Sequence, residues 1–547
     1  MCRVTAGECW HRWSGMRLGV DFGTTRIIVA TVDRGNYPLV NFEGSEGEPR
    51  DWFPPLIAAR GSKRLYGWEA WSAQTDPKAT VIRSIKRLLR EAGPETVIEI
   101  AGQRAPLLEV LTGLTVALRT ALSKHSNLYH AATEPFEIML GIPANANGNQ
   151  RFLTAEAFRR AGFVVLGLLN EPSAASIEFG HASHGRRRED DARSVTLVYD
   201  LGGGTFDASL VEMDAHAHTV IASEGLPAVG GDDFDDILAE LVLESAGFSE
   251  LEHDSLSPAD LFWLHEECRQ KKEALRPNSK QVVVDLGVAV PGCDPIAIPL
   301  AAYYERCRPL VEETIRAVER LLAPCGAPLD ALYVTGGGSE LPLVSRTLKE
   351  VFGSRARRSA YTRAATAIGL AIQADQQAGY QLREKFTRHF GVWREGNQGS
   401  EVIFDALFPK GTPLPAPGDP PLRVTRRYHP AHNIGHFRYL ECGWCGEDGQ
   451  PKGDISVWDE ILFPFDPDLQ SQRNLEPRAV VRSEEVLQQE IEEMYLCDAS
   501  GSVTVRIANT LAGYERSYQI GHWAARGPSI VAGRRRGVRG DKLAHNQ

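Results

Sequence analysis

The feature that most constrains the fold is a strand, turn and strand at residues 195–213. An apolar run rich in β-branched residues ends near Asp200, is interrupted by three glycines and Thr205, and resumes with apolar residues at alternating positions. Consecutive glycines let backbone N–H groups approach a polyanion, and Asp200 lies where a metal ion or water can be held. The pattern favours a phosphate-binding turn, although an ordinary hairpin with a glycine turn fits equally well on its own.

A second copy of the pattern decides between these readings. Residues 18–30 repeat the strand, with Asp21 at its end, a turn containing Gly23, Thr24 and Thr25, and an apolar return strand. Repetition of a whole supersecondary unit predicts two related lobes that each contribute one turn to a shared cleft. The arrangement differs from a Walker loop, because the Gly-Lys-Ser/Thr ending is missing.

Composition narrows the functional classes. The 547 residues predict two to four domains, and a net charge of −11 argues against nucleic acid as the main partner. No segment approaches the roughly 20 apolar residues of a membrane span, and residues 1–15 lack the apolar core of a signal peptide. Nine scattered cysteines suit free thiols in a reducing compartment. We therefore expect a cytoplasmic protein without a membrane partner.

Six motifs in a fixed order carry a family resemblance. They are Asp21-Phe22-Gly23-Thr24-Thr25, Ile85-Lys86-Arg87-Leu88-Leu89, Asn170-Glu171-Pro172-Ser173-Ala174-Ala175, Asp200-Leu201-Gly202-Gly203-Gly204-Thr205-Phe206-Asp207, Gly230-Gly231-Asp232-Asp233-Phe234-Asp235 and Gly336-Gly337-Gly338-Ser339. Over roughly residues 16–380 the chain resembles the heat shock protein 70 (DnaK-type) chaperone family, as a divergent member. The resemblance implies an α/β actin-like (ribonuclease H-like) two-lobed ATPase domain that closes on Mg-ATP, followed by an all-β sandwich domain.

The resemblance also implies roles for individual residues. The catalytic set would be Lys86, Glu171, Thr205 and Asp207, with Lys86 and Glu171 positioning the attacking water, and Asp21 and Asp200 would hold hydrated Mg²⁺. The nucleotide-binding set would be Gly23, Thr24, Thr25, Gly202, Gly203, Gly204, Thr205, Gly231, Lys272, Arg276, Gly336 and Gly337. Pro143 and Arg151 match the relay between the nucleotide and client domains.

The nucleoside end departs from the family pattern. Glu340 stands where an adenine-stacking arginine is usual, and Glu273 stands where many members have a second arginine. A carboxylate cannot stack on a purine as a guanidinium does. Because residues 269, 272, 273 and 276 share one helix face, we hypothesise that Arg276 stacks on the base, that Lys272 reaches the ribose, and that base selectivity is relaxed.

The pattern along the chain predicts five regions. These are an N-terminal extension without order (1–15), the ATPase domain (16–375), a polar linker (376–385), a substrate-binding-like β-sandwich (386–525) and a disordered basic tail (526–547). The family linker is leucine-rich, so the polar segment here leaves interdomain coupling open. We also expect no helical lid, and therefore weak and rapidly exchanging binding of extended peptide.

The resulting hypothesis is an ATP-dependent, chaperone-like protein that binds unfolded or client polypeptide, with a J-domain co-chaperone and a nucleotide-exchange factor as further partners. Alternatives are a nucleotide-binding scaffold with little turnover, a small-molecule kinase of the same superfamily, and an actin-like polymerising protein. A separate question is whether His432, His436, Cys442 and Cys445 bind zinc. Residues along a strand point to opposite faces, so the sequence favours a packed strand with a free cysteine pair.

Overall fold

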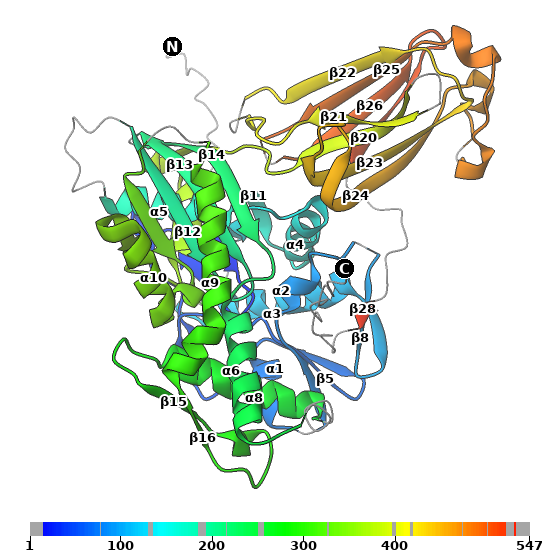
Figure 1. The fold of residues 1–547 in the computed structure, drawn as a ribbon. Coiled ribbons are helices and arrows are strands. Elements are labelled where there is room, and N and C mark those ends of the chain that lie inside the picture. The colour runs from blue at the N-terminus through cyan, green and yellow to red at the C-terminus, as the bar shows by residue number, and fades with distance from the viewer. Residues whose placement is uncertain are drawn as a thin grey trace, which may run out of the picture.

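The computed structural model describes most of the 547 residues. The described residues are 15–76, 78–93, 95–128, 135–183, 193–214, 216–249, 256–324, 328–396, 401–415, 419–472, 474–499, 501–520 and 530–531. Two mixed sheets with helices come first along the chain, and an all-β part follows (Figure 1). Among the described helices, none is both long and apolar enough to cross a membrane.

The first sheet, which we call the N-terminal sheet, has the strand order β11-β10-β1-β2. β1 (Met16–Phe22) and β2 (Ile27–Thr31) form an antiparallel hairpin, and β1 is parallel to β10 (Phe136–Ile142). β10 is in turn parallel to β11 (Val164–Asn170). All of β2 is buried, as expected for a strand covered on both faces.

The second sheet, the central sheet, repeats this arrangement in the order β18-β17-β12-β13-β14-β19. β12 (Ser194–Leu201) and β13 (Phe206–Asp214) form the antiparallel hairpin, and β12 is parallel to β17 (Ala331–Thr335). In both sheets the first strand of the hairpin thus has a parallel neighbour on its other side. The predicted internal repeat of the hairpin is therefore confirmed in the structure. The remaining strands are β14 (Ala217–Leu226), β18 (Ala356–Arg358) and β19 (Gln381–Arg383).

Helices cover these sheets and supply most of the core. Against the central sheet, one apolar cluster includes residues of α6, α8, α9 and α10, and a second cluster joins the N-terminal sheet to α3 and α4. α5 and α11 contact each other and both sheets. The helices are α1 (Trp68–Ser72), α2 (Ile85–Leu88), α3 (Leu107–Lys124), α4 (Gly148–Arg160), α5 (Glu171–Ser183), α6 (Gly231–Ser245), α8 (Pro258–Glu273), α9 (Leu300–Leu322), α10 (Pro342–Phe352) and α11 (Ala365–Ala374).

Short strands outside the two mixed sheets form small sheets of their own. They form a three-stranded sheet β6-β5-β7, another of β28, β8 and β9, and the pairs β3-β4 and β15-β16. Their bounds are β3 (Phe42–Glu43), β4 (Pro49–Arg50), β5 (Ile57–Arg60), β6 (Lys63–Tyr66), β7 (Ala79–Ile82), β8 (Val97–Ile100), β9 (Gln103–Pro106), β15 (Gln281–Val284), β16 (Ile296–Pro299) and β28 (Ile530–Val531).

The C-terminal part is a sandwich of two antiparallel four-stranded sheets. One sheet has the order β21-β20-β23-β24 and the other β22-β25-β26-β27, and one aromatic-rich core lies between them. The alternating short strands therefore predicted an all-β sandwich correctly. The strands are β20 (His389–Gly396), β21 (Glu401–Phe408), β22 (Leu422–Tyr428), β23 (Ile434–Cys445), β24 (Pro451–Pro464), β25 (Ile491–Cys497), β26 (Val503–Asn509) and β27 (Tyr514–Ile520).

Three expectations need correction or restriction. The apolar spacing of residues 81–90 indicates an amphipathic helix in the sequence. The structure has instead the end of β7 and the short helix α2, because Ser84 has a left-handed φ of 54° that separates them. The polar segment 376–385 contains β19, which pairs with β14 as an edge strand of the central sheet. Of the predicted tail, only Ile530–Val531 is described, and it pairs with β8; residues 1–14 also lie outside the described residues.

Candidate functional site

The two glycine turns face each other. The first glycine turn (residues 23–25) joins β1 to β2, and the second glycine turn (residues 202–205) joins β12 to β13. A Cβ added at Gly203 would overlap the Thr25 hydroxyl, and one at Gly204 would lie 2.6 Å from Thr24 Oγ1. Only glycine permits so close an approach. The repeat thus brings the two turns, far apart in sequence, to one cleft.

The start of α6 is fixed against the second glycine turn. The Gly231 N–H donates to the Gly202 carbonyl at 2.9 Å, and the Asp232 N–H donates to the Gly203 carbonyl at 2.7 Å. Lys272 Nζ donates to the Gly231 carbonyl at 2.5 Å and pairs with Asp235 at 2.8 Å. These contacts place Gly231 and Lys272 beside the turn, as the motif pattern predicts.

Buried charges lie behind the two turns. Lys86 Nζ and Glu171 Oε1 are 2.5 Å apart and both side chains are buried. Loss of water raises the pKa of Asp21 and of Asp207 to about 7, and the nearby Glu171 adds to both shifts while Lys86 opposes them. Burial likewise raises the pKa of Asp200, with Glu171 as the next cause. The four carboxylates exceed the one lysine in charge, so a bound cation would relieve their repulsion.

The carboxylates behind the two turns fit one mode of metal binding. Among the described residues, no three His, Cys, Asp or Glu side chains converge closely enough to ligate a metal ion. Mg²⁺ keeps several of its waters and is bound through one or two carboxylates together with substrate phosphates. Asp21 and Asp200 fit that mode of binding, and they do not fit a fully protein-coordinated metal.

Residues of α2 connect the N-terminal sheet region to α6. Ser84 donates to Asp232 Oδ2 at 2.6 Å, and Arg87 Nη2 donates to Asp233 Oδ2 at 2.7 Å. Asp207 accepts a hydrogen bond from the Ala144 N–H at 3.0 Å. The cleft therefore has hydrogen bonds across it in this structure.

An arginine–carboxylate network fills the nucleoside end of the cleft. Glu273 binds Arg26 at 2.7 Å and Arg363 at 3.3 Å, and Glu340 binds Arg363 at 2.5 Å. Arg269 pairs with Glu273 at 3.8 Å. Burial alone would raise the pKa of Glu273, but the three arginines lower it to about 2. Glu273 and Glu340, which depart from the family pattern, thus both form ion pairs with arginines.

The hypothesis for Arg276 is not supported. Its guanidinium donates to the adjacent Leu275 carbonyl at 3.3 Å, and Arg276 does not line the cleft. The helix α8 ends at Glu273, so residue 276 no longer continues the face that carries residues 269, 272 and 273. Arg363 lines the cleft instead. Arg363 lies in the segment Tyr361-Thr362-Arg363-Ala364, which carries no motif that singles it out in the sequence.

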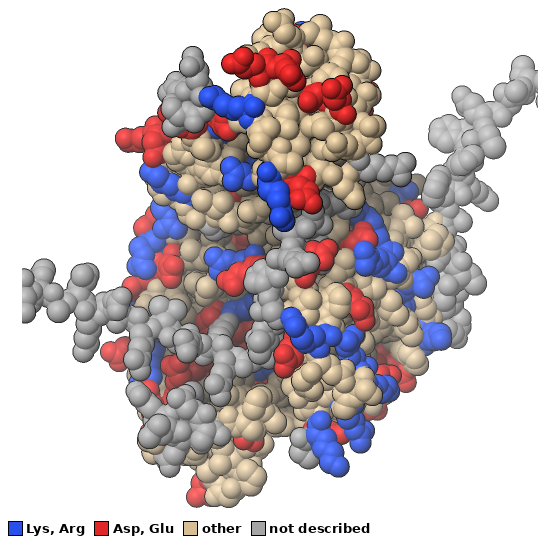
Figure 2. Space-filling model, turned by 90° about the vertical axis from the view of Figure 1, so that its right-hand side faces the viewer, with Lys and Arg blue, Asp and Glu red and all other residues tan. Residues whose placement is uncertain are grey.

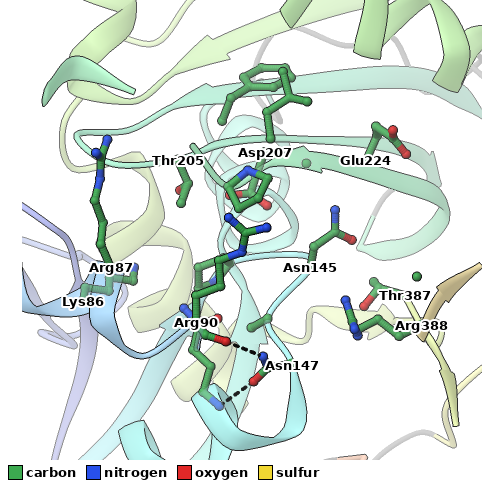
Figure 3. A pocket seen from close by; sticks show the side chains of 18 of the residues that line it. Lys86, Arg87, Arg90, Asn145, Asn147, Thr205, Asp207, Glu224, Thr387 and Arg388 are labelled. Atoms are coloured by element: carbon green, nitrogen blue, oxygen red, sulfur yellow. Dashed lines mark hydrogen bonds between the residues drawn. The ribbon is translucent and has the colours of Figure 1, made fainter. Parts of the chain in front are cut away.

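The remaining candidates also line the cleft, except Gly204 and Asp207. Gly336 has φ 83°, and a Cβ there would overlap the Leu201 carbonyl, so this turn requires glycine. The cavity at the cleft has a volume of about 100 Å³. Its lining contains Asp21, Gly23, Thr24, Thr25, Lys86, Glu171, Asp200, Gly202, Gly203, Thr205, Gly231, Lys272, Gly336 and Gly337. Asp207 lines a second, adjacent cavity with Thr24, Lys86 and Thr205 (Figure 3).

A second group of buried charges lies where the sandwich meets α4. Arg151 Nη2 donates to Asn170 Oδ1 at 2.9 Å, and the Asn170 N–H donates to Glu384 Oε1 at 3.1 Å. The Gly148 N–H donates to Glu441 Oε1 at 2.7 Å. Glu384 and Glu441 were missed from the sequence. Glu441 did leave a signal, because it is a lone carboxylate within the apolar run of β23.

The histidine and cysteine residues of the sandwich do not form one cluster. His436 pairs with Glu460, and His432 lies 3.8 Å from Glu395. The sulfur atoms of Cys442 and Cys445 are 3.8 Å apart, because an irregularity in β23 between Cys442 and Trp444 changes the alternation. These partners favour the packed strand over the zinc alternative.

Comparisons with known proteins agree with the motifs. The family model described as Hsp70 protein matches residues 128–387. The chaperone protein HscA of Escherichia coli O6:H1 (strain CFT073) and that of Escherichia fergusonii are each 29% identical over 387 residues, and each comparison covers 66% of this chain. The chain spans 58% of the length of these relatives. The family match and these relatives agree with the six ordered motifs, and they show that the chain is similar to proteins of the Hsp70 family.

Proposed function

We propose that this chain binds and hydrolyses Mg-ATP and couples the reaction to the binding of client polypeptide. The observation that carries the proposal is the pair of facing glycine turns, with the buried Lys86–Glu171 pair and surplus carboxylates behind them. We infer that the N-terminal and central sheets are the centres of two lobes of an actin-like nucleotide-binding domain at residues 16–375. The relatives are named chaperones, which supports the same class of function.

The residues of the cleft suit a triphosphate. The N–H groups of the two glycine turns and the hydroxyls of Thr24, Thr25 and Thr205 would bind phosphate oxygens from both sides. Asp21 and Asp200 would hold hydrated Mg²⁺, which neutralises phosphate charge. The cavity of about 100 Å³ is smaller than the roughly 300 Å³ or more of typical ligand sites, so nucleotide entry requires the two sheets to separate.

Lys86 and Glu171 would position the water that attacks the terminal phosphorus. Glu171 and the nearby carboxylates raise the pKa of Lys86 against the lowering effect of burial, so the lysine stays cationic. A fixed cation stabilises negative charge that develops on the transferred phosphoryl group. Thr205 and Asp207 would complete the hydrogen bonds around this water. Catalysis is then mainly positioning and charge neutralisation.

Coupling to the sandwich has a physical route in this structure. β19 is hydrogen-bonded to β14 of the central sheet, and Glu384, directly after β19, accepts the Asn170 N–H next to Glu171. From the sandwich, Glu441 reaches the first turn of α4. We infer that residues 376–385 transmit nucleotide state to the sandwich at 386–525 although they are polar, and that a J-domain protein and an exchange factor act on this cycle.

A scaffold with little turnover is the second candidate. The specific observation in its favour is the Arg26–Glu273–Arg363–Glu340 network, which occupies the nucleoside end with internal ion pairs. If this network does not rearrange, nucleotide binding is weak and hydrolysis negligible. Turnover measurements distinguish the two candidates.

Lys86→Ala tests the proposed chemistry. We expect turnover of ATP to fall at least 100-fold, because the fixed cation near the attacking water is lost, while nucleotide affinity changes only a few-fold. Single-turnover hydrolysis and calorimetric titration measure the two quantities separately. Lys124→Ala, an exposed lysine at the end of α3, is the matched control. Equal turnover by the parent and Lys86→Ala would contradict the proposed role of Lys86 in hydrolysis.

Client binding requires its own measurement. Fluorescence anisotropy of labelled apolar peptides should show binding to the full chain, with faster release when ATP is added than with ADP. ATP hydrolysis without peptide binding to any member of a peptide library would support an ATPase with a different partner. Peptide binding that does not respond to nucleotide would contradict the proposed coupling.

A further inference from the structure

A second cavity adjoins the cleft on the side of the sandwich. Its volume is about 430 Å³, and Thr24, Lys86 and Thr205 line both it and the cleft. Its opposite wall comes from the C-terminal part of the chain. The residues of that wall are Thr387, Arg388, Lys410, Gly443 and Trp444. The two parts of the chain therefore enclose one space, which begins at the side chains proposed to surround the attacking water.

The charged residues that line this cavity are mainly cationic. It contains five Lys or Arg residues and two carboxylates, Asp207 and Glu224. Three of the cations have carboxylate partners: Lys86 pairs with Glu171, Arg87 with Asp233 and Arg388 with Glu441. The carboxylate of Glu224 pairs with Arg320, which does not line the cavity. A pocket lined by one sign of charge concentrates ions of the opposite sign.

Two cations of the cavity remain uncompensated. The side chains of Arg90, two residues after α2, and Lys410, two residues after β21, have no ion-pair partner in the part of the chain that the structure describes. They come from the two different parts of the chain. In Figure 3, Arg90 and Arg388 lie on opposite sides of Asn145 and Asn147, with Thr205 and Asp207 above them. The amide side chains of Asn145 and Asn147 thus lie between these two arginines.

We propose that this cavity is an oxyanion site that receives the inorganic phosphate produced by ATP hydrolysis, with Arg90 and Lys410 as its principal cationic groups. The proposal rests on the proposed hydrolysis. Water attacks the terminal phosphorus, the bond to the bridging oxygen breaks, and ADP and inorganic phosphate result. The ADP occupies the cleft, and the phosphate moves past Lys86 and Thr205 into the adjoining space.

The position of the site makes phosphate retention depend on both parts of the chain. Arg90 belongs to the nucleotide-binding part, whereas Lys410, Arg388 and Trp444 belong to the sandwich part. When the sandwich moves away, one wall of the cavity and one of the two uncompensated cations leave with it. The phosphate then loses its enclosure and departs, so domain separation and product release are one event.

Titration with inorganic phosphate tests the site directly. The full chain is titrated calorimetrically with phosphate, both without nucleotide and in saturating Mg-ADP. For Arg90→Ala and for Lys410→Ala we expect about fivefold weaker phosphate binding each, the effect of one lost ion pair of about 1 kcal/mol. Lys124→Ala, which removes an exposed lysine far from the cavity in sequence, should bind as the parent does. Equal affinities in all four proteins would overturn the proposal.

A second arm follows phosphate generated on the protein. In a single turnover, acid quenching reports cleavage and a fluorescent phosphate sensor reports free phosphate. We expect a shorter delay between cleavage and release in Arg90→Ala and in Lys410→Ala than in the parent, with each delay measured from that protein's own cleavage. An unchanged delay would overturn retention of the product. Absence of cleavage in the parent would reject the proposed ATPase activity, while the titration without nucleotide would still decide whether the cavity binds phosphate.

Discussion

At the scale of single residues, the nucleoside end of the cleft differs most from the expectation. Arg363 and Arg26 occupy the space for which Arg276 was expected, and both are held by Glu273. The two glutamates that replace arginines of the family pattern therefore orient other arginines. A guanidinium that is fixed by carboxylates is pre-organised to stack or to donate hydrogen bonds.

Arg363→Ala tests this exchange of roles. Loss of a cation–π or hydrogen-bonding contact of about 0.5–2 kcal/mol predicts a two- to thirtyfold weaker ATP affinity. Arg276→Ala is the matched control and should bind ATP as the parent does, because this side chain does not line the cleft. Calorimetric titration with ATP and with GTP measures both affinity and base preference. The reverse ranking of the two variants would restore the original hypothesis.

The low pKa of Glu273 predicts a pH-dependent contribution to stability. Its pKa of about 2 in the folded chain lies below the ordinary value of 4.5, so the ionised form stabilises the fold above pH 4.5. That contribution, at most about 3 kcal/mol, is lost as the pH falls from 4.5 toward 2. Urea unfolding of the parent and of Glu273→Gln should show a difference about 1 kcal/mol smaller at pH 3.5 than at pH 6. A pH-independent difference would contradict this account.

At the scale of elements, α5 and α11 lie between the two sheets and approach each other closely. A Cβ added at Gly369 of α11 would overlap the backbone carbonyl of Ala174 in α5. Small residues at 173–176 permit this close approach of α5, whose neighbours also include β12 of the central sheet. The close crossing lets two short helices connect both sheets.

Gly369→Ala should therefore destabilise the protein. The added methyl group meets backbone, which cannot move aside as a flexible side chain can, so we expect a loss of about 1–3 kcal/mol or more. Gly167→Ala provides the control, because its nearest neighbour is the flexible Met139 side chain, 3.2 Å away. Thermal unfolding followed by circular dichroism compares the variants. Equal melting temperatures for the two substitutions would show that α5 and α11 can separate without cost.

At the scale of the whole molecule, the sandwich lies against the first turn of α4 (Figure 1). Trp458 of β24 packs where a side chain at Gly148 would stand, and Asn147 Nδ2 donates to Ser456 Oγ at 3.3 Å. On the face of the molecule shown in Figure 2, acidic and basic side chains are intermingled. Local packing at α4 therefore determines how the two parts meet.

Trp458→Ala should loosen this contact. A buried tryptophan supplies much of the apolar area at a small interface, so its loss predicts a more extended molecule with a larger radius of gyration in small-angle X-ray scattering. Val457→Ala changes the neighbouring residue, whose side chain is 53% exposed, and should leave the radius unchanged. If Trp458→Ala also leaves the radius unchanged, the hydrogen bonds of Glu441 and Ser456 suffice to hold the two parts together.

The sequence by itself determined the elements whose signal is local and repeated. The two hairpins with their glycine turns and the β-sandwich follow from periodicity and turn chemistry within short windows. Lys86, Glu171 and Lys272, which line the cleft, were expected there from the resemblance that the ordered motifs carry. These predictions succeeded because each depends on residues close together in the chain.

Only the tertiary structure decided the contacts between distant segments. Three features depend on packing partners more than 20 residues away in the sequence. They are the break at Ser84 between β7 and α2, the pairing of β19 with β14, and the place of Arg363 in the cleft where Arg276 was expected. The cationic cavity that we propose for phosphate combines groups as distant as Arg90 and Lys410. Charged side chains on a polar segment look alike in sequence, whereas their desolvation and pairing, which set their energies, arise only when the chain brings them together.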